Sequence, residues 1–317
     1  MSLYPLRFEP LFKTLIWGGS RLEPMFGRPP SGNPVGEVWL LSDVDGNEST
    51  VSNGALKGQT IRDLCRDHRA ELLGDTPLAA GRFPLLLKFI DAKKELSVQV
   101  HPTDEQAARA KPGQLGKTEA WVVLDREAAT SLLYVGLRPG VTRSSLEEGI
   151  REGTAADALH RFVPEAGDSI LLEAGTVHAI GRDLLLFEIQ QTSDITYRLY
   201  DWGRVDDQGV SRPLHVEDGL ACTDFTRGPI NPKARIASGD LERLVECGYF
   251  SLDRLVIRGE RKVGRAGACS VYVCIDGSGT LDGEPLRAGG TVLLPASHGE
   301  ATVKSDASVT LLLGEPA

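Results

Sequence analysis

The stretch LSVQVHP, from Leu96 to Pro102, decides how the rest of the chain is interpreted. Apolar and polar residues alternate along it, so a β-strand would place Ser97, Gln99 and His101 on one face. An unpaired polar group in an apolar interior costs about 1–3 kcal/mol, so such a row needs partners. Gln and His side chains that converge on one metal ion would satisfy that need. The simpler interpretation is a half-exposed edge strand with a solvated polar face, and this stretch alone favours it.

Two further stretches bring similar polar residues into apolar strands. GKTEAWVVL carries Glu119 at the head of an apolar run, with Lys117 and Trp121 on the same face of the predicted strand. EAGTVHAIG holds His178 directly after another apolar run. Two His, one Glu and one Gln, spread over three strands or strand ends, match a zinc ligand set that leaves room for water or substrate. A single such His is more often structural, but three separate polar intrusions favour the metal site.

The composition is that of an ordinary globular protein. The 317 residues are long for one domain and comfortable for two, with 41% hydrophobic and 25% charged residues. A net charge of −9 argues against nucleic acid or an anionic membrane as partner, because both attract basic surfaces. The five Cys are scattered without a C-x-x-C motif, which indicates a reducing cytoplasm and argues against a thiolate zinc cluster. We find no signal-peptide pattern and no uncharged apolar stretch of membrane-spanning length.

Helical patterns are short and lie between apolar runs. Apolar residues recur at helical spacing over 60–74, where Thr60 is a start signal and Gly74 a stop signal, so one helix is expected. A short helix is expected within 102–111, begun by Thr103. A helical segment is expected over 142–162 and supplies no ligands.

Most of the remaining chain is predicted to be strands. The apolar run 83–91 contains Lys88, which either extends outward or faces a polar cavity. Glu37, ahead of the strand-like residues 38–41, either lines a pocket or lies exposed at the strand entry.

Segments 184–191 and 195–200 are expected to pair as strands around a turn at 192–194. Arg198, in the second of them, lies among aromatic residues, and its simpler interpretation is a surface Arg stacked on Tyr or paired with Asp201. After a Gly-, Pro- and Asn-containing loop at 227–232, the chain is nearly all β.

Taken together, these segments resemble mannose-6-phosphate isomerases (phosphomannose isomerases) of the short bacterial type. The resemblance runs from WGG at Trp17 through GEVW, LSVQVHP, GKTEAW, AGTVHAIG and EIQQTSDITYRLYDWGR, and ends at Arg204. It is specific because several separated motifs occur in the same order. It implies a mainly β fold of two cupin-type jelly-roll barrels with helical insertions at about 60–74 and 142–162. Residues 1–232 would form the catalytic barrel, and residues 233–317 a small C-terminal β-barrel without metal ligands.

The resemblance also implies the components of an active site. One Zn²⁺ per chain would be held by four ligands: Gln99, His101, Glu119 and His178. The family's catalytic arginine falls on Arg198. The positions that line the family's substrate site fall on Lys88, Ser97 and Lys117.

The implied activity is the interconversion of mannose 6-phosphate and fructose 6-phosphate, by proton transfer between C1 and C2 through an enediolate. Arg198 would stabilise the enediolate, Ser97 with Lys88 or Lys117 would hold the phosphate, and either Lys117 or a metal-bound water would transfer the proton. The enzyme would be a cytoplasmic monomer or homodimer that binds a sugar phosphate, and no nucleic acid or membrane.

Two alternatives keep the β-barrel and change the function. Two His and a carboxylate also form the facial triad of non-haem iron oxygenases. However, Gln99 stands where the common cupin oxygenase pattern has a first His, and Glu119 lies eighteen residues after His101. The other alternative is a non-catalytic sugar-binding cupin, which an absent metal or an outward-pointing Arg198 would favour.

Overall fold

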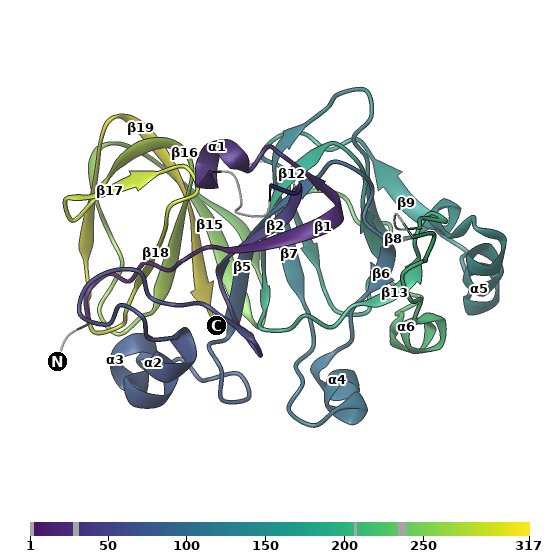
Figure 1. Ribbon diagram of the computed structural model, residues 1–317, viewed down its shortest axis with the longest axis horizontal. Coiled ribbons are helices and arrows are strands. Elements are labelled where there is room, and N and C mark those ends of the chain that lie inside the picture. Colours follow the sequence, from purple (N-terminus) through teal and green to yellow (C-terminus); the bar gives the residue numbers. More distant parts are fainter. Residues whose placement is uncertain (1–2, 28–31, 206–207, 234–239) are drawn as a thin grey trace.

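The computed structural model describes residues 3–27, 32–205, 208–233 and 240–317. These residues form a mainly β fold, as predicted, in which all strand pairs are antiparallel (Figure 1). The strands of the central sheet are, in order, β1 (Leu11–Gly19), β2 (Val35–Leu41), β5 (Leu85–Ala92), β12 (Leu184–Gln191), β7 (Glu119–Arg126) and β10 (Ser169–Leu172).

A second sheet lies against one face of the central sheet, and a C-terminal sheet lies against the other. The second sheet has the order β13 (Tyr197–Tyr200), β6 (Val98–Val100), β11 (His178–Ile180), β8 (Leu133–Leu137) and β9 (Leu159–Phe162). The C-terminal sheet has the order β14 (Leu241–Glu246), β15 (Phe250–Val263), β19 (Ala301–Pro316), β16 (Ser270–Leu281) and β17 (Glu284–Arg287), and β18 (Thr291–Leu294) also pairs with β16. Two short strands, β3 (Asp43–Val44) and β4 (Asn47–Glu48), pair separately.

Short helices lie around the sheets. α5 and α6 flank the second sheet, whereas α2 and α3 lie at one end of the C-terminal sheet (Figure 1). The helices are α1 (Glu23–Phe26), α2 (Ile61–Asp67), α3 (Arg69–Leu73), α4 (Asp104–Ala110), α5 (Arg143–Glu152), the 3₁₀ turn η1 (Ala155–Ala158) and α6 (Val216–Cys222).

The central sheet is buried on both faces, which explains its nearly continuous apolar strands. In β5, Leu87 and Phe89 pack in a cluster shared with the C-terminal sheet, whereas Ile90 and Ala92 pack in a cluster shared with the second sheet. Complete burial of a side chain of this size contributes about 1.5–3 kcal/mol. The space between the central and second sheets is therefore apolar, and any polar residue in it needs a partner.

Two rows of polar residues enter this space from opposite sheets. In the central sheet, Glu188 is in register with Lys88 on one neighbouring strand and with Trp121 on the other. In the second sheet, Gln99 is in register with both His178 and Arg198. The candidate site forms where these rows come together.

The helix predicted over 60–74 is divided into α2 and α3 at His68, where φ is −133°. The apolar spacing continues across His68, so periodicity could not reveal the break. The start at Thr60, which makes a capping box with Asp63, and the stop at Gly74 are confirmed. The start of the 102–111 helix at Thr103 is confirmed as well.

The helix predicted over 142–162 begins as expected after Thr142 but ends at Gly153, which adopts the left-handed conformation. After η1, residues 159–162 form strand β9, which pairs with β8 at the edge of the second sheet. The prediction of helix there was therefore wrong. Leu159 fits a helical period only by coincidence, and its burial comes from pairing with the sheet.

The expected pairing of segments 184–191 and 195–200 was also wrong, because β12 and β13 lie in different sheets. The backbone N–H of Thr192 donates to the carbonyl of Pro84 at 3.1 Å, and the Ser193 hydroxyl donates to the carbonyl of Leu115 at 2.8 Å. These bonds to distant segments carry the chain from one sheet to the other instead of closing a hairpin.

The two predicted domains share a core. Leu6 forms a bridge with Leu293, and a single apolar cluster contains Phe89 and Phe187 together with Phe250 of the C-terminal sheet. The predicted boundary at 232/233 adjoins residues 234–239, which lie outside the described residues, and the division into domains stays a prediction. Within the described part of the chain, no helix is long and apolar enough to cross a membrane.

Candidate metal centre and substrate cavity

Three of the predicted metal ligands meet in the interior of the protein. The Nε2 atoms of His101 and His178 lie 3.3 Å from Oε2 and Oε1 of Glu119, respectively. All three side chains are buried, with ligand atoms within 4.8 Å of one another. Within the described residues, this is the group of His and carboxylate side chains that could hold a metal ion.

Both imidazoles are oriented for coordination through Nε2. Nδ1 of His101 is 2.8 Å from the carbonyl oxygen of Ile195, and Nδ1 of His178 is 2.9 Å from that of Thr176. A neutral imidazole that donates from Nδ1 keeps its lone pair on Nε2. Burial, together with the nearby positive charge, lowers the pKa of His101 to about 3, and burial also lowers the pKa of His178. Both rings are therefore neutral, which is the form that binds metals.

The separation of these atoms fits a tetrahedral ion. Ligands placed at about 2.0–2.2 Å from a tetrahedral zinc lie roughly 3.3–3.6 Å from one another. Each imidazole Nε2 has one Glu119 oxygen at 3.3 Å, Oε2 for His101 and Oε1 for His178, and coordination through a single oxygen would require the carboxylate to rotate. Both oxygens of Glu119 are buried, and Oε1 accepts no hydrogen bond from the described residues, whereas Oε2 is paired with Lys117. A cation would therefore satisfy the oxygen that the described residues leave without a donor.

Gln99 adjoins the same three residues. Its Nε2 lies 3.2 Å from Nε2 of His178, and its Oε1 accepts a hydrogen bond of 3.3 Å from the Ser97 hydroxyl. Coordination requires the amide oxygen, so the amide must rotate by half a turn to act as a ligand. The two orientations have nearly the same shape, and hydrogen bonding decides between them. After such a rotation, Gln99 could hold a metal ion together with these three residues.

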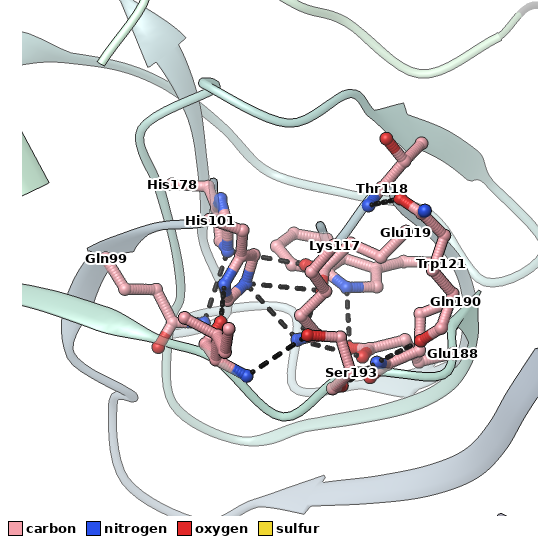
Figure 2. A network of polar contacts seen from close by, with 12 residues as sticks. Gln99, His101, Lys117, Thr118, Glu119, Trp121, His178, Glu188, Gln190 and Ser193 are labelled. Carbon is pink, nitrogen blue, oxygen red and sulfur yellow. Dashed lines mark hydrogen bonds and ion pairs between the residues drawn. The ribbon is translucent and has the colours of Figure 1, made fainter. Parts of the chain in front are cut away.

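Lys117 supplies positive charge beside the ligands (Figure 2). Its Nζ lies 2.6 Å from Oε2 of Glu119, 3.2 Å from Nε2 of His101 and 3.5 Å from Oε1 of Glu188. Burial raises the pKa of Glu119, but the charge of the nearby Lys117 outweighs it and helps to hold that pKa well below its usual value. Glu119 is therefore ionised, as a metal ligand must be.

Glu188 is a site residue that the sequence analysis missed. Its Oε2 accepts a hydrogen bond of 2.9 Å from the Trp121 indole, and its Oε1 lies 3.2 Å from Nζ of Lys88. Burial and the charge of Glu119 raise the pKa of Glu188. The available signal was one acidic residue inside the apolar run 184–191, the same kind of signal that singled out Lys88.

Lys88 faces the interior and does not extend outward. Only 6% of the residue is exposed, and its Nζ also lies 3.4 Å from Oε1 of Glu37. Glu37 lines a cavity, which is the first of its two expected placements, and it accepts a hydrogen bond from the Trp39 indole. Burial lowers the pKa of Lys88, but Glu188 and Glu37 outweigh this and raise it overall, so Lys88 is charged.

A cavity of about 170 Å³ lies beside the metal centre. Gln99 and Lys117 form its wall next to the buried ligands, and all three predicted substrate-site residues line it. Other lining residues are Leu15, Trp17, Glu37, Ile90, Leu96, Ile180, Glu188, Thr196, Arg198 and Arg212.

Arg198 lines this cavity and is not paired with Asp201. Its Nη1 donates to the carbonyl of Pro213 at 2.8 Å, and its buried Nε has no hydrogen-bond partner among the described residues. Asp201 instead accepts hydrogen bonds from Arg204 and Arg212. The expected alternative of a pair between Arg198 and Asp201 is therefore wrong.

Comparison with known proteins agrees with this geometry. Residues 6–119 match the family model of the phosphomannose isomerase type I catalytic domain, and residues 240–312 match that of the mannose-6-phosphate isomerase cupin domain. The mannose-6-phosphate isomerase ManA of Bacillus subtilis (strain 168) is 36% identical over 309 residues, which cover 95% of this chain and 96% of that protein.

The chain belongs to the mannose-6-phosphate isomerase family.

Solved structures support the same assignment. The crystal structure of the mannose 6-phosphate isomerase from Bacillus subtilis superposes with a TM-score of 0.87 at 33% identity and covers 98% of this chain and 99% of that chain. A zinc-bound mannose 6-phosphate isomerase structure shares the fold with a TM-score of 0.76 at 16% identity and covers 98% of this chain and 99% of that chain. Family membership favours an isomerase over the oxygenase and the non-catalytic cupin.

Proposed function

We propose that the chain is a zinc-dependent isomerase that interconverts mannose 6-phosphate and fructose 6-phosphate. The observation that carries the proposal is the convergence of His101, Glu119 and His178 beside a cavity lined by Lys117 and Arg198, in a member of this family. Proton transfer between C1 and C2 needs groups that stabilise an enediolate and a group that carries the proton. The cavity supplies both kinds of group.

One Zn²⁺ per chain would be held by the two histidines, Glu119 and the oxygen of Gln99. When bound there, the ion supplies a Lewis acid that polarises substrate oxygens. Hard oxygen ligands alone would suit Mg²⁺ or Ca²⁺, whereas two imidazoles favour zinc or another transition metal.

Arg198 is proposed to stabilise the negative charge that develops on O1 and O2. Its strand neighbour is Gln99, and both residues line the cavity. The buried Nε without a partner is a donor that a substrate oxygen could satisfy. The planar fork of an arginine keeps such donors in a fixed direction.

Lys117 is proposed as the proton carrier among the chain's own residues. Its Nζ lies at the cavity wall, and Oε1 of Glu188 is 3.5 Å away. Because the pKa of Glu188 is raised, this carboxyl can accept a proton from Lys117 and return it. Trp121 holds the carboxyl in place through the bond to Oε2.

Ser97 completes the proposed substrate contacts, and Lys88 positions two carboxylates of the cavity. Ser97 is buried and its hydroxyl binds Gln99, so it can contact a sugar oxygen close to the metal centre. The charge of Lys88 is already balanced by Glu37 and Glu188, so its role is to keep these carboxylates in position.

Metal analysis combined with a coupled assay of mannose 6-phosphate isomerisation tests this function. We expect about one zinc per chain, activity that a chelator removes, and recovery of activity on addition of Zn²⁺. A zinc-loaded protein that fails to isomerise mannose 6-phosphate would refute the proposal, as would full activity in metal-free protein.

A further inference from the structure

We infer that Arg212, with Arg204, forms the site that binds the phosphate group of the substrate. This inference rests on the proposed function, because it assigns one end of the same substrate. Arg212 lies between β13 and α6, and its side chain lines the small cavity together with Arg198. No sequence motif drew attention to it.

The first argument is the local balance of charge. Among the described residues, three arginines, Arg198, Arg204 and Arg212, lie around one carboxylate, that of Asp201. Asp201 is only 5% exposed, so water screens these charges poorly. One negative charge against three guanidinium groups leaves a surplus of positive charge, and a phosphate monoester carries about −1.5 to −2 at pH 7.

At the metal end of the cavity, the lysines of the chain are already paired with carboxylates. There the two lysines, Lys88 and Lys117, face the carboxylates of Glu37, Glu119 and Glu188 at distances between 2.6 and 3.5 Å. Both ammonium groups already have anionic partners, so they offer little attraction to a phosphate. The arginine end is therefore the better anion site, in contrast to the expectation that Ser97 and a lysine hold the phosphate.

The second argument is the supply of donors. Nε and Nη2 of Arg212 make a two-pronged pair with Asp201, at 2.8 and 2.6 Å, which holds the plane of the guanidinium. Nη1 lies on the other side of the fork, where it can donate to a different acceptor. Arg204 shares Asp201, and its buried Nε has no hydrogen-bond partner among the described residues.

Arg212 and Arg204 line two hollows that share Leu15 in their walls. Arg204 lines a wider hollow of about 920 Å³, which also contains Glu95 and Trp202. Arg198, opposite Gln99 in the second sheet, lies next to the metal centre, and its pKa is lowered by burial and by the charge of Arg212. The reacting carbons would lie near Arg198, and the phosphate near the hollow.

The test compares Arg212→Gln with the wild-type enzyme, both loaded with zinc. We expect the KM for mannose 6-phosphate and the inhibition constant of inorganic phosphate to rise about tenfold or more, the loss typical of a charged hydrogen bond. Turnover should fall much less, and zinc content should not change. Arg212→Lys keeps the charge but loses the planar fork of donors. Its KM and inhibition constant should therefore lie between those of the wild type and those of Arg212→Gln.

Arg182→Gln is the matched control. Arg182 lines the same wide hollow, but it pairs with Glu95 and its side chain is 53% exposed. Arg182→Gln removes the same charge and leaves the contacts of Asp201 in place. The KM for mannose 6-phosphate and the inhibition constant of inorganic phosphate should therefore stay nearly unchanged. Equal effects of Arg182→Gln and Arg212→Gln would show that phosphate is attracted by positive charge in general and not by a specific site at Arg212. That result would overturn the inference.

Direct titration of the zinc-loaded protein with inorganic phosphate separates this inference from the proposed function. If wild-type protein binds phosphate and Arg212→Gln does not, the site is supported even where no isomerase activity is found. If wild-type protein does not bind phosphate, or Arg212→Gln binds it equally well, the inference fails even for an active isomerase. If Arg212→Gln does not fold, as judged by thermal melting, the same comparison is made with Arg212→Lys.

Discussion

Glu119→Gln is the substitution that tests the metal centre most directly. It keeps the size and shape of the side chain and removes one negative charge from a fully buried position. In this structure, both imidazole Nε2 atoms lie 3.3 Å from a Glu119 oxygen, and the Lys117 ammonium lies 2.6 Å from Oε2. The substitution therefore affects both the binding of a cation and the pairing of Lys117.

The expected magnitude follows from the number of ligands. The apparent free energy of zinc binding at four-ligand sites is about 10–16 kcal/mol, or ~2.5–4 kcal/mol per ligand if shared equally. Loss of the anionic ligand should therefore weaken zinc binding by about two to three orders of magnitude. In metal-free protein, Glu188 at 3.5 Å is the anionic partner that Lys117 keeps among the described residues, and breaking a buried pair costs about 3–5 kcal/mol of stability.

The assay is zinc content after dialysis against graded chelator, with thermal melting in the presence and absence of Zn²⁺. Glu37→Gln is the matched control, because it makes the same substitution in the same cavity, where Glu37 contacts Lys88 and Trp39 and no proposed ligand. We expect Glu37→Gln to keep its zinc and Glu119→Gln to lose it. Full zinc stoichiometry with unchanged affinity in Glu119→Gln would refute the assignment of the site.

Three further predictions concern neighbouring groups. Arg198→Ala should bind zinc normally and turn over about a hundredfold more slowly or worse, and Arg198→Lys should stay impaired; near-normal turnover with only a raised KM would show that the residue merely binds substrate. Lys117→Met should bind zinc at least as tightly in a metal titration, because Nζ no longer competes for Oε2 of Glu119, yet lose about 10²–10⁴ in turnover; weaker zinc binding contradicts this. Asp104 accepts hydrogen bonds from the Gly116 backbone, the Gln191 amide and the Tyr249 hydroxyl, so Asp104→Asn should lower the free energy of unfolding by about 1–3 kcal/mol. Tyr249→Phe removes one of these bonds and should cost about 1 kcal/mol in the same denaturation experiment; equal losses would show that the other two bonds contribute nothing.

Local signals in the sequence were enough for the elements and for part of the candidate site. The helix starts at Thr60, Thr103 and Thr142 depend on bonds within one turn, so short stretches of sequence predicted them correctly. The alternation in LSVQVHP likewise predicted that Gln99 and its polar neighbours share a face, because side chains alternate along any strand. The family motifs added the remaining ligands.

Other features depended on contacts between segments far apart in the chain. β12 and β13 follow each other closely in sequence but belong to different sheets, because Thr192 and Ser193 bind backbone carbonyls elsewhere. The break at His68 and the strand β9 were missed because the spacing of apolar residues indicates which side chains are buried. It does not indicate where the backbone changes direction or conformation.

By itself, the sequence determined a mainly β chain with a set of polar residues that need partners. The packing of two sheets decided which of those residues meet. Glu188 lies beside Lys117 and Lys88, and Arg212 lies beside Arg198, only because their strands and loops are brought together by apolar clusters on either face of the central sheet. The free energy that holds these charges in place comes from burial of apolar side chains throughout both clusters, which no single motif contains.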